Sequence, residues 1–497
     1  MSACPFFFST FRVECRVFEA RRVLVPERTY PAFDKHAHPS ARRLAAAFPL
    51  GGRGRVPRLA AVPSAPRVWL ATLGCAKNQV DSEKLLGRLA HAGFAAAPAA
   101  EEAEVVMVNT CAFIEAARRE SVDAILEVAR QKAPGARLVV LGCLAQRYQG
   151  ELAAALPEAD AVVPIERYGD LVDRLAALTG WKPTGLRSEP RDILDEMRRP
   201  TPATPYAYLK IAEGCDKPCT FCAIPQFRGP QRSRRPAEVR AEAQALAAAG
   251  VGELVLVAQD LTGYGQDLGT PGGLADLLRF LEDVAGLRRL RLLYLHPREV
   301  SDGLIAEMAG SPVVAPYFDL SLQHSSGRLL RAMRRPGDGE SHLALLERIR
   351  AAAPDAALRS SFIVGFPGET EDDAAGLAEF LTAARLDWAG FFPFSPEEGT
   401  PAAGLPGRVP AEEAAERGRL LEAIQEGITA ERNAAQVGRV VEVLVDLVED
   451  GTPVGRSYRE APEIDGMILL DRGRTGEWRR ARITGSYGSD TVAEVLA

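Results

Sequence analysis

The stretch that decides the fold is residues 213–222, which read EGCDKPCTFC and place Cys215, Cys219 and Cys222 in a C-x3-C-x2-C pattern. Three thiolates so close together can hold three corners of a cubane iron–sulfur cluster, because soft sulfur ligands suit iron. A zinc site would need a fourth Cys or His nearby, and this loop contains none. Three protein ligands leave one iron of a four-iron cluster open. The pattern therefore predicts a catalytic [4Fe–4S] centre, with structural or zinc-bound cysteines as the alternative.

Strand-like and helical stretches alternate around this loop, from residue 206 to residue 431. The expected strands are 206–212, 253–258, 290–295, 317–322, 358–364 and 388–394. Helices are expected between them, for example over 236–249 and 372–384, and a long helix over 411–436 leads out. Six strand–helix repeats predict a partial (βα)6 TIM-like barrel, short of the eight repeats of a full one. The cysteine loop follows the first strand and so belongs to the carboxyl end of the barrel.

A smaller α/β domain is expected over residues 67–180, followed by a Pro-rich, charged linker over 181–205. Its expected strands are 68–73, 105–109, 138–141 and 161–163, with helices over 82–92 and 116–130. Short apolar runs that alternate with helices are typical of βαβ units and a parallel sheet.

Three further cysteines, Cys75, Cys111 and Cys143, have no local motif in common, but each follows a predicted strand. Carboxyl ends of parallel strands lie along one edge of the sheet, where open α/β folds bind ligands. The three thiols could therefore converge on a second metal centre that again leaves one iron open. The alternative is three buried cysteines that act as small hydrophobic residues.

Other polar or glycine-rich segments in the barrel region give weaker signals. The run 362–369, FIVGFPGE, is a strand followed by a glycine-rich turn, which lets backbone approach a ligand closely. His324 follows another strand and is expected to be a core histidine rather than a ligand. Gln259, Asp260 and Tyr264 also follow a strand end, and the sequence assigns them no role.

The two ends of the chain differ in composition from the middle. Residues 1–66 hold eight prolines, ten arginines and one lysine against four acids. We expect a disordered extension or a start codon placed too far upstream, to which Cys4 and Cys15 belong, with an organelle targeting peptide as the alternative. Residues 432–497 contain short strands between Gly-rich turns, which predicts a small antiparallel β-barrel of the oligonucleotide-binding kind.

Composition narrows the class of protein. The 497 residues carry 60 basic and 66 acidic side chains, a net charge of −6. That balance disfavours a protein that coats nucleic acid. The sequence contains no apolar run of 18 or more residues, so no membrane-spanning helix is expected. Eight cysteines are too few for a disulfide scaffold in a chain of this length.

With Phe221 before its last cysteine, the C-x3-C-x2-C loop resembles the radical S-adenosylmethionine (SAM) signature. Together with the upstream three-cysteine domain and the C-terminal barrel, residues 67–497 are similar to the radical SAM methylthiotransferases. The resemblance implies that each cysteine triad holds a [4Fe–4S] cluster, that S-adenosylmethionine is the cosubstrate, and that the C-terminal barrel is a TRAM domain. It also implies that Phe221 packs against the adenine and that Gly365, Gly368 and Glu369 line the cofactor site.

Two branches of that family act on different substrates, an N6-isopentenyl adenosine of tRNA or an aspartate of small-subunit ribosomal protein S-twelve. Residues 72–83 (TLGCAKNQVDSE), 394–400 (FSPEEGT) and 455–466 (GRSYREAPEIDG) are similar to the ribosomal-protein branch. Ala76 stands where that branch often has proline, a change not expected to affect cluster binding. Residues 432–497 carry nine basic and eleven acidic side chains, a net of −2, which suits a basic protein better than an RNA backbone.

The resemblance implies a cytoplasmic enzyme that uses a radical from S-adenosylmethionine to remove a hydrogen from the aspartate β-carbon. A reductant such as flavodoxin or ferredoxin would supply the electron. Such a C–H bond has no acidic proton, so general-base chemistry cannot break it. The alternatives are a tRNA methylthiotransferase and, in another class, a non-catalytic iron–sulfur or zinc protein that binds RNA.

Overall fold

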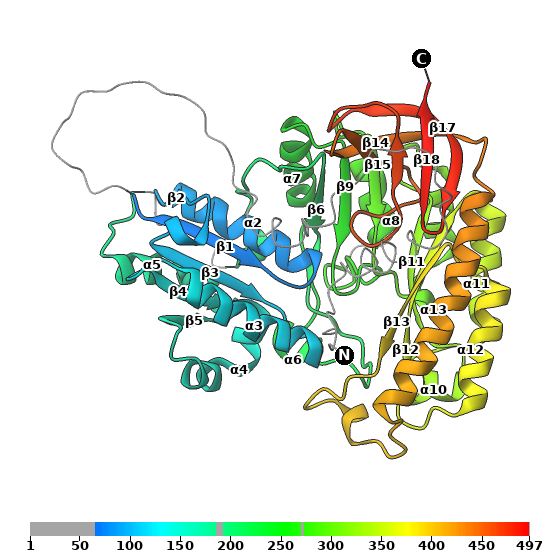
Figure 1. Cartoon of the computed structure of the whole chain (residues 1–497), viewed down its shortest axis with the longest axis horizontal. Helices are drawn as coiled ribbons and strands as arrows, with labels where there is room; N and C mark the ends of the chain where they lie inside the picture. Colours follow the sequence, from blue (N-terminus) through cyan, green and yellow to red (C-terminus); the bar gives the residue numbers. More distant parts are fainter. Residues whose placement is uncertain (1–64, 185–191, 270–272, 497) are drawn as a thin grey trace. The chain divides into compact units, whose positions relative to one another are not determined.

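The computed structural model describes residues 65–184, 192–269 and 273–496 (Figure 1). The chain divides into two compact units, residues 1–203 and residues 204–497. The extension predicted for residues 1–66 lies almost entirely outside the described residues. The partial barrel and the C-terminal barrel, predicted as two domains, belong to the same compact unit.

The first unit is built on a five-stranded parallel sheet with the order β2-β1-β3-β4-β5. Its strands are β1 (Arg67–Thr72), β2 (Ala95–Ala96), β3 (Val105–Thr110), β4 (Arg137–Leu141) and β5 (Ala161–Val163). Its helices are α2 (Ala76–His91), α3 (Glu115–Gln131), α4 (Gly142–Ala155) and α5 (Leu171–Thr179), with 3-10 turns η3 (Ala100–Glu102), η4 (Ile165–Asp170) and η5 (Ile193–Asp195). The predicted parallel α/β domain is confirmed. Strand β3 is buried along its whole length, as expected for a central strand covered on both faces.

Helix α2 begins six residues earlier than the sequence predicts, at Ala76 rather than at Ser82. Cys75 is its N-cap residue, in an extended conformation. The first turns bury polar side chains, among them Lys77, Asn78 and Asp81. Because these positions are polar, the apolar period that identifies an amphipathic helix does not appear there.

The second unit begins with six parallel strands, which confirms the predicted partial barrel. The strands are β6 (Tyr206–Lys210), β9 (Glu253–Val257), β10 (Arg289–Leu292), β11 (Tyr317–Gln323), β12 (Ala357–Val364) and β13 (Trp388–Pro393). They form the sheets β10-β9-β6 and β11-β12-β13, and single bridges such as Leu295 to Leu320 connect β10 with β11. A short antiparallel pair, β7 (Ala212–Glu213) and β8 (Arg232–Ser233), closes the loop that carries the three cysteines.

Helices follow the strands and bury apolar faces against them. They are α6 (Ile224–Arg228), α7 (Pro236–Ala248), α8 (Gly273–Leu281), α9 (Asp302–Gly310), α10 (Gly327–Ala332), α11 (Gly339–Ala352), α12 (Glu371–Ala384) and α13 (Ala411–Ala434), with 3-10 turns η6 (Pro297–Glu299) and η7 (Pro401–Gly404). The long helix α13 packs along β13 and α12, as Figure 1 shows. The apolar core therefore lies between the barrel strands and this outer layer of helices.

The chain ends in a closed five-stranded barrel with the order β14-β15-β16-β18-β17. Its strands are β14 (Val440–Glu449), β15 (Thr452–Arg456), β16 (Ile468–Leu470), β17 (Trp478–Tyr487) and β18 (Asp490–Val495). The barrel is predicted as antiparallel, but β16 and β18 pair in parallel. An odd number of strands in a closed ring cannot alternate in direction throughout, so one parallel pair is unavoidable.

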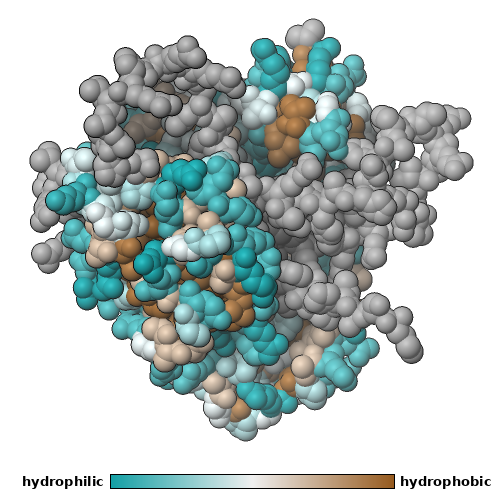
Figure 2. All heavy atoms as spheres, turned by 60° about the vertical axis from the view of Figure 1, so that its left-hand side comes forward, coloured by the Kyte–Doolittle hydropathy of each residue, from teal (hydrophilic) through white to brown (hydrophobic). Residues whose placement is uncertain are grey.

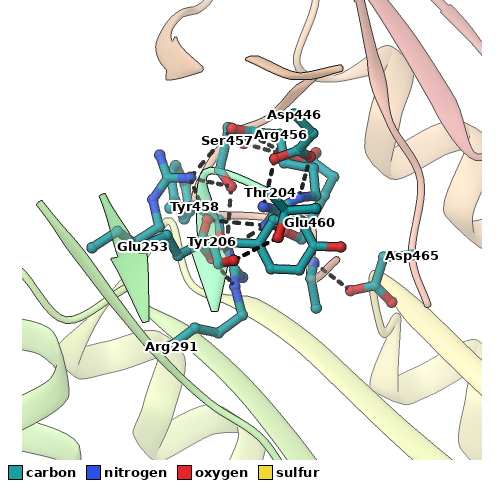
Figure 3. Close-up of polar contacts among 12 residues, drawn as sticks. Thr204, Tyr206, Glu253, Arg291, Asp446, Arg456, Ser457, Tyr458, Glu460 and Asp465 are labelled. Atoms are coloured by element: carbon teal, nitrogen blue, oxygen red, sulfur yellow. Dashed lines mark hydrogen bonds and ion pairs between the residues drawn. The ribbon is translucent and has the colours of Figure 1, made fainter. Parts of the chain in front are cut away.

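The segment Arg456–Asp465, which leads from β15 toward β16, contacts the amino-terminal ends of all six barrel strands. The strand residues involved are Tyr206, Glu253, Arg289, Tyr317, Arg359 and, just before β13, Asp387. Figure 3 shows part of this network. It occupies one end of the barrel, so the opposite, carboxyl end is the one available for chemistry.

Glu253 is at the centre of this network. Its carboxylate is fully buried and accepts hydrogen bonds from Arg291 at 2.8 Å and from Arg456 at 3.0 and 3.2 Å, with Arg289 at 3.4 Å. Burial alone would raise the pKa of Glu253, but the guanidinium groups of Arg456, Arg291 and Arg289 outweigh it and hold the pKa at about 2. The carboxylate is therefore ionised at neutral pH and neutralises charge that would otherwise be buried without a partner.

On the face drawn in Figure 2, hydrophilic side chains cover most of the coloured surface, and hydrophobic ones lie in small groups between them. Within the described ranges, no helix has the length and apolar character that crossing a bilayer requires.

We predict that Glu253→Gln lowers the free energy of unfolding by about 3–5 kcal/mol, because it leaves three guanidinium groups buried around a neutral amide. Urea titration of the full chain, followed by circular dichroism, measures the change. The matched control is Glu442→Gln, since the carboxylate of Glu442 pairs with Arg288 at a site where both side chains are nearly half exposed. Loss of that pair should change stability by less than about 1 kcal/mol, and equal losses in both variants would contradict the prediction.

Candidate functional site

The first cysteine triad lies along the carboxyl edge of the parallel sheet. Cys75 follows β1, Cys111 follows β3 directly, and Cys143 is the second residue of α4, after β4. In the strand order β2-β1-β3-β4-β5, the chain reverses direction across the sheet between β1 and β3, and this switch point is where open α/β sheets bind ligands. Cys75 and Cys111 therefore flank the position at which the fold itself favours a ligand.

Asn78 connects the three loops that carry this triad. Its side-chain nitrogen donates to the carbonyl oxygens of Leu73, at 3.0 Å, and Thr110, at 2.9 Å. Its side-chain oxygen lies 3.7 Å from the sulfur of Cys143. One buried amide therefore holds the residues before Cys75 and Cys111 and also contacts Cys143.

Gly74 allows the loops to approach closely. It adopts a left-handed conformation, with φ of +89°, and a Cβ at this position would lie 2.7 Å from Cys111 Cβ and 2.9 Å from its sulfur. Ser121 fixes Cys111 from the other side, because its hydroxyl accepts from the Cys111 N–H at 3.0 Å and donates to its carbonyl at 2.9 Å.

The thiols of this triad lie close enough to influence one another. Burial raises the pKa of Cys111 well above its ordinary value, and the neighbouring Cys143 and Cys75 act in the same direction. The raised pKa keeps the Cys111 thiol protonated, so thiolates form at this buried site only beside a cationic centre that offsets their mutual repulsion. The donor set therefore fits an iron–sulfur cluster.

The second triad lies in the loop between β6 and α7. The Cys215 N–H donates to the carbonyl of Gly229 at 3.1 Å, and Gln231 N–H donates to Asp216 at 3.1 Å, so both ends of the loop are held together. Gly214 has φ of +80°, and a Cβ there would lie 2.0 Å from the carbonyl oxygen of Pro230. The glycine before Cys215 is therefore required by this close approach.

Charged side chains attach the same loop to the barrel. Lys217 forms ion pairs with Asp260, at 3.2 Å, and with Glu299, which follow β9 and β10. Glu213, two residues before Cys215, pairs with Lys210 at 2.7 Å and Arg228 at 3.1 Å. Asp260, whose role the sequence leaves open, is thus one of the residues that fix the cysteine loop.

The middle of the loop is anchored by Thr220. Its N–H donates to the carbonyl of Met333 at 3.1 Å, and its hydroxyl donates to that of Ala332 at 2.8 Å. Phe221 is half-buried against an apolar cluster that includes Phe366, at the turn after β12. Its predicted contact with an adenine stays a prediction.

The residues predicted to line a cofactor, Gly365, Gly368 and Glu369, have partners within the chain. The Glu369 carboxylate accepts from the Gly365 N–H at 2.7 Å and from Arg417 at 2.9 Å. A Cβ on Gly365 would lie 2.5 Å from Ala414 Cβ, and Gly368 N–H donates to Gly407 at 2.7 Å. Packing and hydrogen bonds within the chain are thus sufficient to account for the conformation of this turn. Its role toward a cofactor stays a prediction.

Several buried polar atoms at the carboxyl end of the barrel have no hydrogen-bond partner among the described residues. They include Gln259 Oε1 after β9 and His296 Nδ1 after β10, whereas His324 Nε2 after β11 lies 3.7 Å from the Glu369 carboxylate. His324 is fully buried, as predicted for a core histidine, and its Nδ1 accepts from the N–H groups of Ser325 and Ser326 at 2.9 Å each. An unpaired buried polar atom costs about 1–3 kcal/mol, so these atoms fit a site that a polar ligand such as S-adenosylmethionine completes.

Across residues 65–184, 192–269 and 273–496, no three His, Cys, Asp or Glu side chains converge on a point that could hold a single metal ion. Ligands of a cubane bind separate irons at different corners, so they do not converge on one atom. Each triad supplies three thiols, which fits a four-iron cluster with one iron left without a protein ligand.

Comparison with known families covers most of the chain. Three family models match: an uncharacterized protein family, UPF0004, over residues 67–164; the Radical SAM superfamily over residues 209–381; and the TRAM domain over residues 437–496. They confirm the predicted radical SAM barrel and TRAM domain. Among solved structures, the radical S-adenosylmethionine methyltransferase TsrM from Kitasatospora setae is 17% identical, with 68% of this chain and 77% of that chain covered and a TM-score of 0.49.

Curated relatives match nearly end to end. A ribosomal protein uS12 methylthiotransferase RimO from Saccharopolyspora erythraea is 43% identical over 475 residues, covering 87% of this chain and 96% of the relative. The protein of the same name from Moorella thermoacetica is 47% identical over 427 residues, covering 85% and 97%. This chain belongs to the RimO family of ribosomal protein uS12 methylthiotransferases. Membership of the RimO family confirms the ribosomal-protein branch, which residues 72–83, 394–400 and 455–466 predict.

We predict that Gly74→Ala removes iron from the first triad only, because the new methyl group collides with Cys111. Iron analysis of anaerobically reconstituted protein should give about four irons per chain instead of about eight. Gly135→Ala is the matched control, since Gly135 also has positive φ, at +85°, but nothing lies within 4 Å of the new Cβ. Full iron content in the Gly74 variant, or equal loss in both, would contradict the prediction.

Proposed function

We propose that this RimO-family chain transfers a methylthio group to the β-carbon of an aspartate in ribosomal protein uS12, with two [4Fe–4S] clusters and S-adenosylmethionine. The observation that carries the proposal is the pair of cysteine triads, each at the carboxyl edge of parallel strands, in a chain of this family. Cys215, Cys219 and Cys222 would hold the cluster that binds S-adenosylmethionine. The first triad, Cys75, Cys111 and Cys143, would hold the cluster that carries the sulfur to be transferred.

When bound, the clusters and S-adenosylmethionine supply the one-electron chemistry that breaks an unactivated C–H bond. The protein's contribution is to hold the ligands in place. Lys217, Asp260 and Glu299 fix the first half of the cysteine loop, and Thr220 fixes the second half. Among the described residues, Gln259 and His296 each have a polar atom without a hydrogen-bond partner at the same end of the barrel, where the polar groups of S-adenosylmethionine need partners.

Charge supports a protein substrate over tRNA. The chain has a net charge of −6, and residues 432–497 carry nine basic against eleven acidic side chains. A domain that follows an RNA backbone needs a cationic groove, whereas ribosomal proteins are typically basic. A small electron-transfer protein such as flavodoxin or ferredoxin is the expected reductant, and the expected compartment is the cytoplasm.

We predict that the reconstituted chain, with dithionite and S-adenosylmethionine, adds a methylthio group to an aspartate of purified uS12, read by mass spectrometry of the protein. The same reaction with tRNA should leave the nucleosides unchanged. Modified adenosine in tRNA and unmodified uS12 would favour the tRNA branch, and no reaction with either would support a non-catalytic iron–sulfur protein.

Substitutions in the two cysteine triads should have different effects on the reaction. Cys219→Ala should abolish cleavage of S-adenosylmethionine to 5′-deoxyadenosine, because the cosubstrate loses its cluster. Cys111→Ala should retain that cleavage, yet yield no methylthiolated uS12. Cys4→Ala, which removes a thiol outside both triads, should change neither readout. The assignment of roles would be wrong if Cys219→Ala still cleaved the cosubstrate at the wild-type rate.

A further inference from the structure

Arg335 lies beside the cysteine loop, in the connection between α10 and α11. Its side chain is almost fully buried, with 6% exposed. One guanidinium nitrogen lies 3.8 Å from the sulfur of Cys219, within hydrogen-bonding distance for sulfur, and another donates to the carbonyl of Ser321 in β11. Its backbone N–H donates to Leu330 at 2.7 Å, which fixes the residue at the end of α10.

This arginine differs from every other buried arginine among the described residues. Each of the others forms an ion pair with a carboxylate: Arg88, Arg228, Arg234, Arg289, Arg291, Arg456 and Arg459. Within the same residues, Arg335 has no carboxylate at ion-pair distance. A buried charge without a counter-charge is strongly destabilising. The site therefore requires an anion, and the Cys219 sulfur at 3.8 Å supplies one once it is a cluster thiolate.

The backbone around Arg335 holds the same part of the cysteine loop. Ala332 and Met333 accept the two hydrogen bonds of Thr220, the residue after Cys219. Segment 332–335 thus positions both the loop and a cation against one cluster ligand.

We propose that Arg335 raises the reduction potential of the cluster held by Cys215, Cys219 and Cys222, through its charge and an N–H···S hydrogen bond to Cys219. The inference rests on the proposed function, which places a cluster on these cysteines. Reduction adds one negative charge to the cluster, so a neighbouring cation stabilises the reduced state more than the oxidised state. Hydrogen bonds to the cluster sulfurs act in the same direction. Arg335 is a positioning residue that acts through Cys219, and it makes the electron transfer that starts the reaction easier.

The test is a redox titration without S-adenosylmethionine, in which electron paramagnetic resonance measures the reduced cluster. Full-length protein with Cys75, Cys111 and Cys143 replaced by alanine is used throughout, so that one cluster is observed. Arg335→Gln should shift the midpoint potential to a more negative value, and Arg335→Lys, which keeps the charge, should shift it less. Arg331→Gln is the matched control, because it removes a cation from an exposed position of α10 and should leave the potential unchanged.

A wild-type potential in Arg335→Gln, or equal shifts in the Gln and Lys variants, would overturn the proposal. Either result would instead favour a role of Arg335 confined to binding the carboxylate of S-adenosylmethionine, because that cosubstrate is absent from the titration. A protein that holds no cluster would instead overturn the proposed function. If Arg335→Gln fails to bind iron, the hydrogen bond is tested instead in the parent protein labelled with 15N-arginine. Pulsed spectroscopy of its reduced cluster should detect coupling to an arginine nitrogen, and absence of that coupling refutes the hydrogen bond.

Discussion

The parallel alignment of neighbouring strands is the constraint on which both cysteine sites depend. Parallel strands end at the same edge of a sheet, so loops that are distant in sequence meet there. Cys75, Cys111 and Cys143 come together because β1, β3 and β4 are adjacent and in register. In the barrel the same rule brings the residues after β9, β10 and β11 to the loop that carries Cys215. Neither site could form if one of these strands ran in the opposite direction.

The two ends of the radical SAM barrel carry different kinds of polar network. At the amino-terminal end, Glu253 is saturated by guanidinium groups, and the segment Arg456–Asp465 is held by every strand. At the carboxyl end, within the part of the chain that the structure describes, Gln259 and His296 have atoms without partners and Arg335 has no carboxylate at ion-pair distance. A satisfied network stabilises the fold, whereas an unsatisfied one is kept at a cost and fits a ligand. The groups around Gln259, His296 and Arg335 therefore fit a ligand at the carboxyl end of the barrel.

Sequence reasoning succeeded where the information is local or periodic. The spacing of Cys215, Cys219 and Cys222 predicts a shared site without any knowledge of the fold, and the alternation of strands and helices predicts both parallel sheets. It missed the first six residues of α2, because Asn78 and its neighbours are polar and buried. Asn78 lies within the motif of residues 72–83, yet only the structure reveals that its amide joins three loops. No periodic signal identifies Arg335, which lies far along the chain from the sulfur it contacts.

The two triads also differ in how their geometry is maintained. Cys215, Cys219 and Cys222 lie on one short loop that needs external anchors. Asp260, Ala332 and Arg335 provide them, by contacts to Lys217, Thr220 and Cys219 of the loop. The first triad is distributed over three loops of a rigid sheet, so its main requirement is close packing between the loops. Gly74 and Asn78 meet that requirement, one by the absence of a side chain and one by an amide that bonds in several directions. A local motif thus depends on distant residues for its position, whereas a dispersed one depends on the fold itself.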